Sequence, residues 1–259
     1  MKLFHSLLVV ALLAVTSPAY AAAVCPEDGV LRHSFSIGAA GIVMPKFEGA
    51  DSSRAVPYPI LEYKNQYFFI STLDGAGVNL LRAPTMKTGL LVNYRFGRRE
   101  NDSRLLDGLG NVKGGMEAGA FFDWQFHERL GVAVRALHGL GEAKGFTADF
   151  TLTWNQPVTT DLTFVLQGST VYSDSDYNKK YFGVTDKQSR RSGYDPYTPG
   201  MGIKSVSIKP ALSYTFCDNY MIGAFYEYKR LTGPAADSPL VKRGSENQGM
   251  AGITLTWTY

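Results

Sequence analysis

The strongest constraint on this chain is an alternation of apolar and polar residues, with period two, in segments of about ten residues. In one such segment the apolar face carries Ala251, Ile253, Leu255, Trp257 and Tyr259. Successive side chains of a strand point to opposite faces, so the pattern predicts strands with two unlike faces. Strands of soluble sheets run about 5–6 residues, whereas about ten residues cross a bilayer at a tilt. Because hydrocarbon solvates no backbone amide, such strands predict a closed transmembrane β-barrel.

Twelve segments fit this all-β, antiparallel pattern. They are expected near residues 33–44, 54–63, 66–72, 77–82, 86–96, 115–126, 130–138, 145–154, 161–172, 205–216, 220–229 and 248–259. The segments 66–72 and 77–82 are the weakest, so ten strands remain an alternative. Pro57 and Pro59 fit a central strand poorly, and they predict an irregular or bulged segment.

The predicted connections alternate between short turns and longer loops. The long ones are residues 45–53, 97–114, 173–204 and 230–247. Outer-membrane barrels have short turns on the periplasmic side and long loops outside, so we expect both termini to be periplasmic.

The first 21 residues are predicted to be a cleaved secretory signal peptide, which leaves residues 22–259 for the barrel. Lys2 supplies a positive charge, an apolar run covers residues 3–15, and Ala19 and Ala21 are small residues at the positions that a signal peptidase reads. The apolar run is about 13 residues long, too short to span a bilayer of ~30 Å.

Composition excludes several other classes. The mean hydropathy is −0.10 although aromatic residues reach 13%, which argues against a helical membrane protein. The net charge of +3 gives no electrostatic case for nucleic acid. Two cysteines cannot form a disulfide scaffold or a Cys-based zinc array.

Several residue strings, taken in order, carry a resemblance to a known family. They are PKFEGAD at 45–51, PYP at 57–59, EY at 62–63, DGAGVNL at 74–80, YRFGRRE at 94–100, LDGLGNV at 106–112, EAG at 117–119, YFGVT at 181–185 and DSPLV at 237–241. With these strings the chain resembles the MipA/OmpV family of Gram-negative outer-membrane proteins over essentially all of residues 22–259. The resemblance implies an outer-membrane barrel that acts as a non-enzymatic scaffold, linking a lytic transglycosylase to a penicillin-binding protein in peptidoglycan synthesis. A surface adhesin and a small-solute pore are the alternatives.

Charged residues lie on the polar faces of the predicted strands and are expected to form a network in the lumen. They are Arg95, Glu117, Asp123, Arg135, Asp149, Lys209, Glu227 and Lys229. A barrel of this size has limited room, so a largely filled interior is favoured over a channel. Three histidines lie outside the predicted signal peptide: His33, His127 and His138. They have neither a nucleophile motif nor metal-ligand spacing beside them, so no enzymatic activity, metal or cofactor is expected.

The long loops are rich in tyrosine and arginine, which are enriched at binding hot spots. The predicted outer-loop binding residues are Arg98, Arg99, Tyr177, Tyr181, Arg190, Arg191 and Tyr194. They predict an adhesive surface or a contact with lipopolysaccharide phosphates, with an ordinary solvated loop as the alternative. Cys25 and Cys217 are expected at the same rim in an oxidising compartment, and they predict a disulfide, with two unpaired cysteines equally open.

Overall fold

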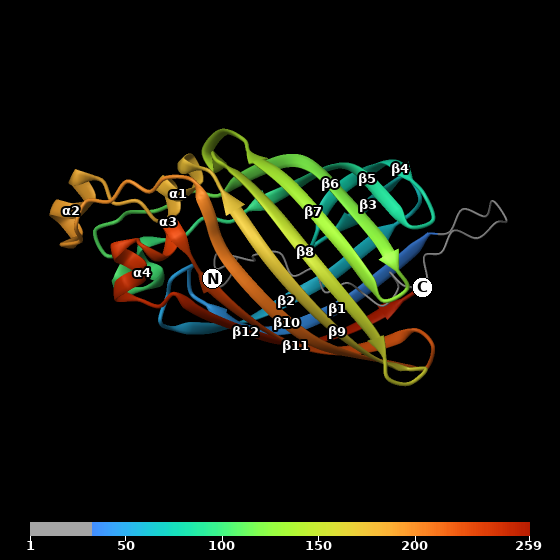
Figure 1. Ribbon diagram of the computed structural model, residues 1–259. Helices are drawn as coiled ribbons and strands as arrows, with labels where there is room; N and C mark the ends of the chain where they lie inside the picture. The colour runs from blue at the N-terminus through green and yellow to red at the C-terminus, as the bar shows by residue number, and fades with distance from the viewer. Residues whose placement is uncertain (1–32) are drawn as a thin grey trace, which may run out of the picture.

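The alternating segments form twelve antiparallel strands that close into a barrel, because β1 pairs with β12 as well as with β2 (Figure 1). The structure is a computed structural model that describes residues 33–259, so the predicted signal peptide and Cys25 lie outside the described residues. The strands are β1 (Ser34–Pro45), β2 (Ser53–Lys64), β3 (Phe68–Ser71), β4 (Gly75–Arg82), β5 (Met86–Arg95), β6 (Gly115–His127), β7 (Leu130–Gly139), β8 (Phe146–Pro157), β9 (Leu162–Ser173), β10 (Gly202–Phe216), β11 (Tyr220–Leu231) and β12 (Asn247–Thr258).

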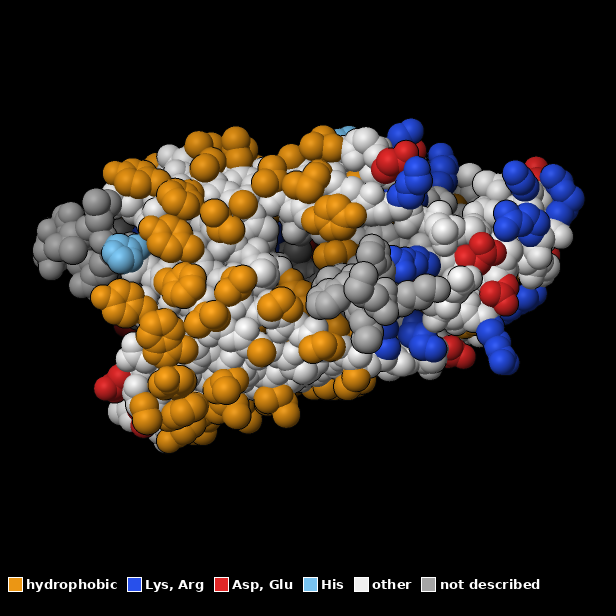
Figure 2. Space-filling view, turned by 180° about the vertical axis from the view of Figure 1, so that it is seen from behind, with side chains coloured by type: hydrophobic (Ala, Val, Ile, Leu, Met, Phe, Trp, Pro, Cys, Tyr) orange, Lys and Arg blue, Asp and Glu red, His pale blue; other side chains and the backbone are white. Residues whose placement is uncertain are grey.

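The two faces of each strand have opposite environments. On β12, Ile253 and Leu255 are exposed on the outer surface, whereas the alternate Thr254 and Thr256 are buried in the lumen. The same alternation runs around the barrel and leaves a wide band of exposed apolar side chains on its outside (Figure 2). A soluble protein rarely exposes apolar patches of this extent, and the band is what a hydrocarbon environment requires.

Two expectations about strands are settled by the pairing. Residues 66–72 and 77–82 do contribute strands, β3 and β4, so the twelve-strand prediction is confirmed and the ten-strand alternative is wrong. No bulge occurs at Pro57 and Pro59, since β2 pairs with β1 in an unbroken register. The irregularity predicted there lies on the other side of β2, where β3 pairs only with residues 62–64. The backbone N–H and C=O of Leu61 both bond Thr72, on the side of β3. Backbone groups of alternate residues in a strand point to the same side, so the nitrogens of Pro57 and Pro59 also face β3 and not β1.

Short helices in the long connections were not predicted. They are α1 (Ser175–Tyr181), α2 (Asp186–Ser192), α3 (Gly233–Ala236) and α4 (Pro239–Arg243), with the 3₁₀ turns η2 (Glu100–Asp102), η3 (Arg104–Leu106) and η4 (Gly141–Ala143). Within residues 33–259, no helix is long and apolar enough to cross a membrane.

The long loops and the short turns lie at opposite ends of the barrel (Figure 1). The first and last described strands meet at the short-turn end, where the backbone of Phe35 bonds that of Tyr259. The expectation that this end faces the periplasm stays a prediction.

Candidate functional site

The loop end is closed by a folded cap, which we define as residues 46–52, 96–114, 174–201 and 232–246. Two apolar clusters form its core. One comprises Phe47, Ala50, Leu106, Leu109, Val184, Tyr194 and Leu240, and the other comprises Tyr177, Tyr181, Phe182, Ala235 and Val241 together with Leu231, the last residue of β11. Phe182 and Leu106 are completely buried. The cap therefore has a core of its own, separate from the inner wall of the barrel.

Local signals begin and end the cap helices. The Asp174 carboxylate accepts a hydrogen bond from the Tyr177 N–H at 2.8 Å and begins α1. Thr185 and Gln188 form a capping box at the start of α2, which ends at Gly193 in the left-handed conformation (φ 71°). Proline occupies the first turn of both α3 and α4.

A largely buried ion pair joins the cap to the barrel. Lys204 Nζ on β10 lies 2.7 Å from Glu48 Oε1 in the β1–β2 loop, and both groups bond the hydroxyl of Tyr177 on α1. Burial alone raises the pKa of Glu48, but the charges of Lys204 and Lys229 outweigh it, and the net pKa lies below the usual 4.5. Burial, together with the Glu48 charge, raises the pKa of Tyr177 well above 10.0, so its hydroxyl stays protonated.

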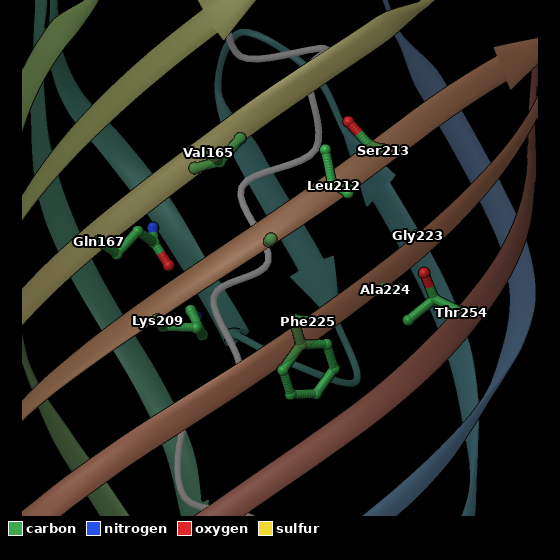
Figure 3. Close-up of a pocket in the computed structure, with 10 residues that line it drawn as sticks. Val165, Gln167, Lys209, Leu212, Ser213, Gly223, Ala224, Phe225 and Thr254 are labelled. Atoms are coloured by element: carbon green, nitrogen blue, oxygen red, sulfur yellow. The ribbon is translucent and has the colours of Figure 1, made fainter.

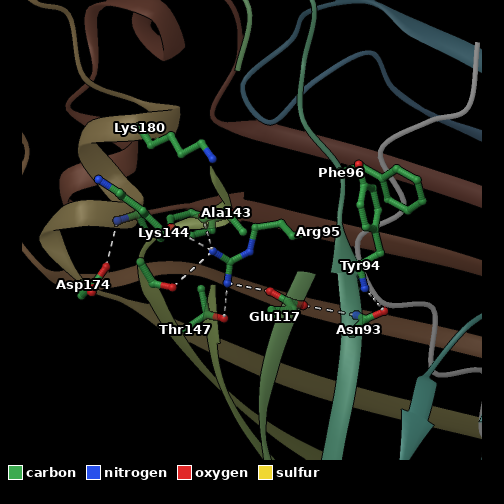
Figure 4. A network of polar contacts seen from close by, with 12 residues as sticks. Asn93, Tyr94, Arg95, Phe96, Glu117, Ala143, Lys144, Thr147, Asp174 and Lys180 are labelled. Carbon is green, nitrogen blue, oxygen red and sulfur yellow. Dashed lines mark hydrogen bonds and ion pairs between the residues drawn. The ribbon is translucent and has the colours of Figure 1, made fainter. Parts of the chain in front are cut away.

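Arg95, at the loop end of β5, is the second junction (Figure 4). Its guanidinium contacts Glu117 at 2.7 Å, the Thr147 hydroxyl at 3.3 Å, and the three carbonyls of residues 143–145 in the β7–β8 connection. It also lies 4.8 Å from the centre of the Tyr177 ring. One side chain thus ties β5, β6, β8 and α1 together through charge-assisted bonds.

The lumen holds further ion pairs below these junctions. Lys87 pairs with Asp123 at 3.4 Å, and Lys229 pairs with Glu227 at 3.6 Å. Arg135 on β7 reaches Asp74 in the β3–β4 turn at 3.0 Å, across the lumen.

All eight predicted lumen residues lie on inward-facing positions of their strands. The structure brings Arg95 together with Glu117, and Glu227 together with Lys229. Asp123 and Arg135 pair instead with Lys87 and Asp74, which had not been singled out. Asp149 accepts a hydrogen bond from Thr151 at 2.8 Å, and Lys209 is buried on β10.

The inner wall is divided into a polar part and an apolar part. The apolar part comprises Ala40, Ile42 and Met44 of β1, Val56, Tyr58 and Ile60 of β2, Phe225 of β11 and Met250 of β12. A small pocket beside it is lined by residues of β9–β12, including Gln167, Lys209, Ser213 and Thr254 (Figure 3). The hydroxyls of Ser213 and Thr254 are buried without a partner among the described residues, although most of the pocket lining is apolar.

The predicted outer-loop residues do not form one surface. Tyr177, Tyr181, Tyr194 and Arg98 are buried within the cap. Arg98 donates to the Tyr181 carbonyl at 2.7 Å, and burial lowers its pKa to about 10, so it stays charged at neutral pH. In this conformation these four residues hold the cap together and offer no contact to an outside ligand. Arg99, Arg190 and Arg191 are exposed, and a binding role for them stays a prediction.

The residues that sequence reasoning missed are Glu48, Asp74, Lys87 and Lys204. Glu48 and Asp74 stand within strings that carry the family resemblance, which was the available signal. Cys217 is exposed in the short turn between β10 and β11, and its pairing with Cys25 remains untested. No group of three or more metal-ligating side chains occurs within residues 33–259.

Comparison with known proteins finds a matching family and relatives that align along most of the chain. The family model described as MltA-interacting protein MipA matches residues 37–259. The MltA-interacting protein of Escherichia coli (strain K12) is 26% identical over 227 residues, covering 85% of this chain and 89% of that protein. A putative outer membrane protein of the same organism, YiaT, is 24% identical over 233 residues, covering 87% and 90%. Among solved structures, the NanC porin aligns with a TM-score of 0.45 at 9% identity, covering 86% of this chain and 98% of the porin.

The family match spans nearly the whole described barrel, and the membrane-facing apolar band and the outer-membrane relatives agree with it. The chain is an outer-membrane β-barrel that belongs to the MltA-interacting protein MipA family.

Proposed function

We propose that this protein is a non-enzymatic scaffold of the outer membrane that binds a lytic transglycosylase and, through it, a penicillin-binding protein of peptidoglycan synthesis. The observation that carries the proposal is membership of a family named for its interaction with MltA, together with a relative of the same name that aligns along most of its length. Adhesion through the exposed arginines of the cap is the alternative.

The geometry supports an interaction role over an open pore. The cap places two apolar clusters across one mouth of the barrel, and the lumen below it carries ion pairs of both signs. A solute would have to displace Arg95 or Lys204 from partners at 2.7 Å, and breaking a buried ion pair costs about 3–5 kcal/mol.

The short-turn end is the side we assign to the partner. The connections there are residues 65–67, 83–85, 128–129, 158–161 and 217–219, and several carry exposed side chains, among them Tyr67 and Val158. This end offers little area, and stable complexes bury about 1,200–2,000 Å² in total. The partner is therefore expected to touch most of the rim.

A pull-down tests the proposal directly. The full-length protein in detergent is immobilised, and a purified lytic transglycosylase without its lipid anchor is titrated over it. We expect saturable capture that is weakened at least tenfold by the pair Tyr67→Ala and Val158→Ala, since tenfold is about 1.4 kcal/mol. Met201→Ala, an equally exposed apolar residue at the loop end, is the matched control and leaves capture unchanged.

Two outcomes would contradict the scaffold. Absence of capture by the folded barrel removes the proposed partner. Discrete conductance steps in planar bilayers, retained after purification to homogeneity, would favour the small-solute pore, whereas the scaffold predicts a silent bilayer.

A further inference from the structure

The barrel wall is incomplete between β2 and β5 at the loop end. Strand β2 pairs with β1 along its whole length, but it pairs with β3 only through residues 62–64. Strand β5 pairs with β6 along its whole length, but its register with β4 ends at Val92. Within residues 33–259, no strand covers residues 53–59 of β2 or residues 93–95 of β5 from the open side. We call this gap the lateral opening, and the space-filling view shows a hollow in the apolar wall (Figure 2).

Both edges of the lateral opening present fewer free donors than an unpaired strand normally does. On β2, Pro57 and Pro59 direct nitrogens without hydrogen toward the opening. Just before β5, the backbone carbonyl of Thr85 accepts a hydrogen bond from the backbone N–H of Gln125 on β6. The backbone N–H and C=O groups of odd-numbered residues on β5 therefore point toward β6, and those of even-numbered residues point toward β4 and the opening. The N–H of Tyr94 is one of these, and it is bonded by the Asn93 side chain at 2.8 Å (Figure 4). Two prolines and one bonded amide thus reduce the number of free donors at these edges.

The floor of the lateral opening is fixed in place. It is the β3–β4 turn, residues 72–75, where Gly75 adopts a positive φ of 81°. The Tyr58 hydroxyl donates to the Thr72 carbonyl, and the Thr72 hydroxyl donates to the Pro59 carbonyl at 3.0 Å. Asp74 is held from across the lumen by Arg135 at 3.0 Å. These bonds hold the β3–β4 turn in this position.

The lateral opening connects two apolar surfaces. Outside it, Ala55, Pro57 and Val92 belong to the exposed band that faces the membrane. Inside it, Val56 and Tyr58 belong to the apolar part of the lumen wall, which continues over β1, β11 and β12. Arg54 lies at the upper rim on the inward face, 3.9 Å from Asp102, and its Nε is buried without a partner among the described residues.

We propose that the lateral opening is a portal through which an acyl chain of a membrane lipid enters the lumen and lies against this apolar wall. Arg54 supplies at the rim the positive charge that a lipid phosphate requires. An acyl chain fits this path because it needs no hydrogen bonds and passes from the hydrocarbon of the membrane to another apolar surface. The proposal is independent of the scaffold role, since it concerns the opposite end of the barrel.

The test uses the whole exported protein in bilayers that contain a phospholipid with a photoreactive diazirine in its acyl tail. After irradiation, the labelled residues are mapped by mass spectrometry. Outward residues are labelled in any barrel, so the inward residues Ile42, Val56 and Tyr58 carry the test. We expect these to be labelled, while Leu137 and Val165, equally buried on the far inner wall, are not.

Other outcomes overturn the portal. Label confined to outward residues shows that no chain enters the lumen. Label on Leu137 and Val165 equal to that on Val56 and Tyr58 shows that lipid enters the lumen without using the opening. Label on Val56 and Tyr58 that appears only after residues 22–32 are removed makes that segment the occupant. As a variant, Ala55→Trp fills the rim and is expected to reduce the inward label at least fivefold. Ala120→Trp, another exposed alanine of the outer band on β6, leaves it unchanged.

Discussion

At the loop end, four segments distant in sequence pack two apolar clusters and place Glu48, Tyr177 and Lys204 in one buried contact. At the short-turn end, the connections are two to four residues long and their side chains are mostly exposed. The loop end therefore uses its side chains for internal contacts, and the short-turn end leaves its side chains free for another molecule. Length alone would suggest the opposite, because long loops usually carry function.

The largest effect is expected from emptying the cap core. Phe182→Ala removes a completely buried ring, and such substitutions cost about 3–5 kcal/mol in the free energy of unfolding. Limited proteolysis should then cut within residues 174–201 while the strands stay intact. The matched change Tyr67→Ala, at an exposed short turn, should leave both proteolysis and stability unchanged, and equal sensitivity of the two would remove the contrast between the ends.

Breaking the Arg95 junction comes next. Arg95→Met leaves the buried Glu117 carboxylate without its ion-pair partner. We expect the free energy of unfolding, measured with urea in detergent, to fall by about 3 kcal/mol. The exposed pair of Arg230 and Glu246 is the control, because Arg230→Met should cost at most about 1 kcal/mol. Similar losses for both variants would contradict the structural role of the Arg95 junction.

A smaller effect should follow acidification. The pKa of Glu48 is lower in the folded protein than its ordinary 4.5, so the unfolded chain binds the proton first. The stability that Glu48 contributes is therefore fully present above about pH 4.5 and is lost as the pH falls through the lower folded value. The cap should become more protease-sensitive in this range, and Glu48→Gln should remove that pH dependence. A variant with an unchanged acid profile would contradict the assignment.

The smallest effect concerns the short-turn rim. If Cys217 pairs with Cys25, the intact mass of the exported protein is about 2 Da below that of the reduced form, and Cys217→Ser alters stability only slightly because the bond tethers a terminal segment. Two alkylated thiols under non-reducing conditions would refute the pairing.

The sequence allowed the barrel to be predicted because alternation is a local property of each strand. Every predicted lumen residue has the inward orientation that its strand pattern implied. The ion-pair partners were not predictable in the same way, since Asp74 and Arg135 are 61 positions apart and Glu48 and Lys204 are 156 apart. The cap helices were missed because helices of four to seven residues are marginal alone and depend on tertiary packing. The strings that carry the family resemblance contain Phe47, Leu106, Phe182 and Leu240, which meet in the cap.

The central claim is that the short-turn end receives the partner while the loop end is closed upon itself. Photoreactive amino acids placed singly at Tyr67, Thr160 and Asp218, or at Arg190 and Lys242 of the cap, test this in intact envelopes. The account predicts that a lytic transglycosylase is crosslinked from the three short-turn positions and from neither cap position. Crosslinking from Arg190 or Lys242, with none from the short turns, would contradict it.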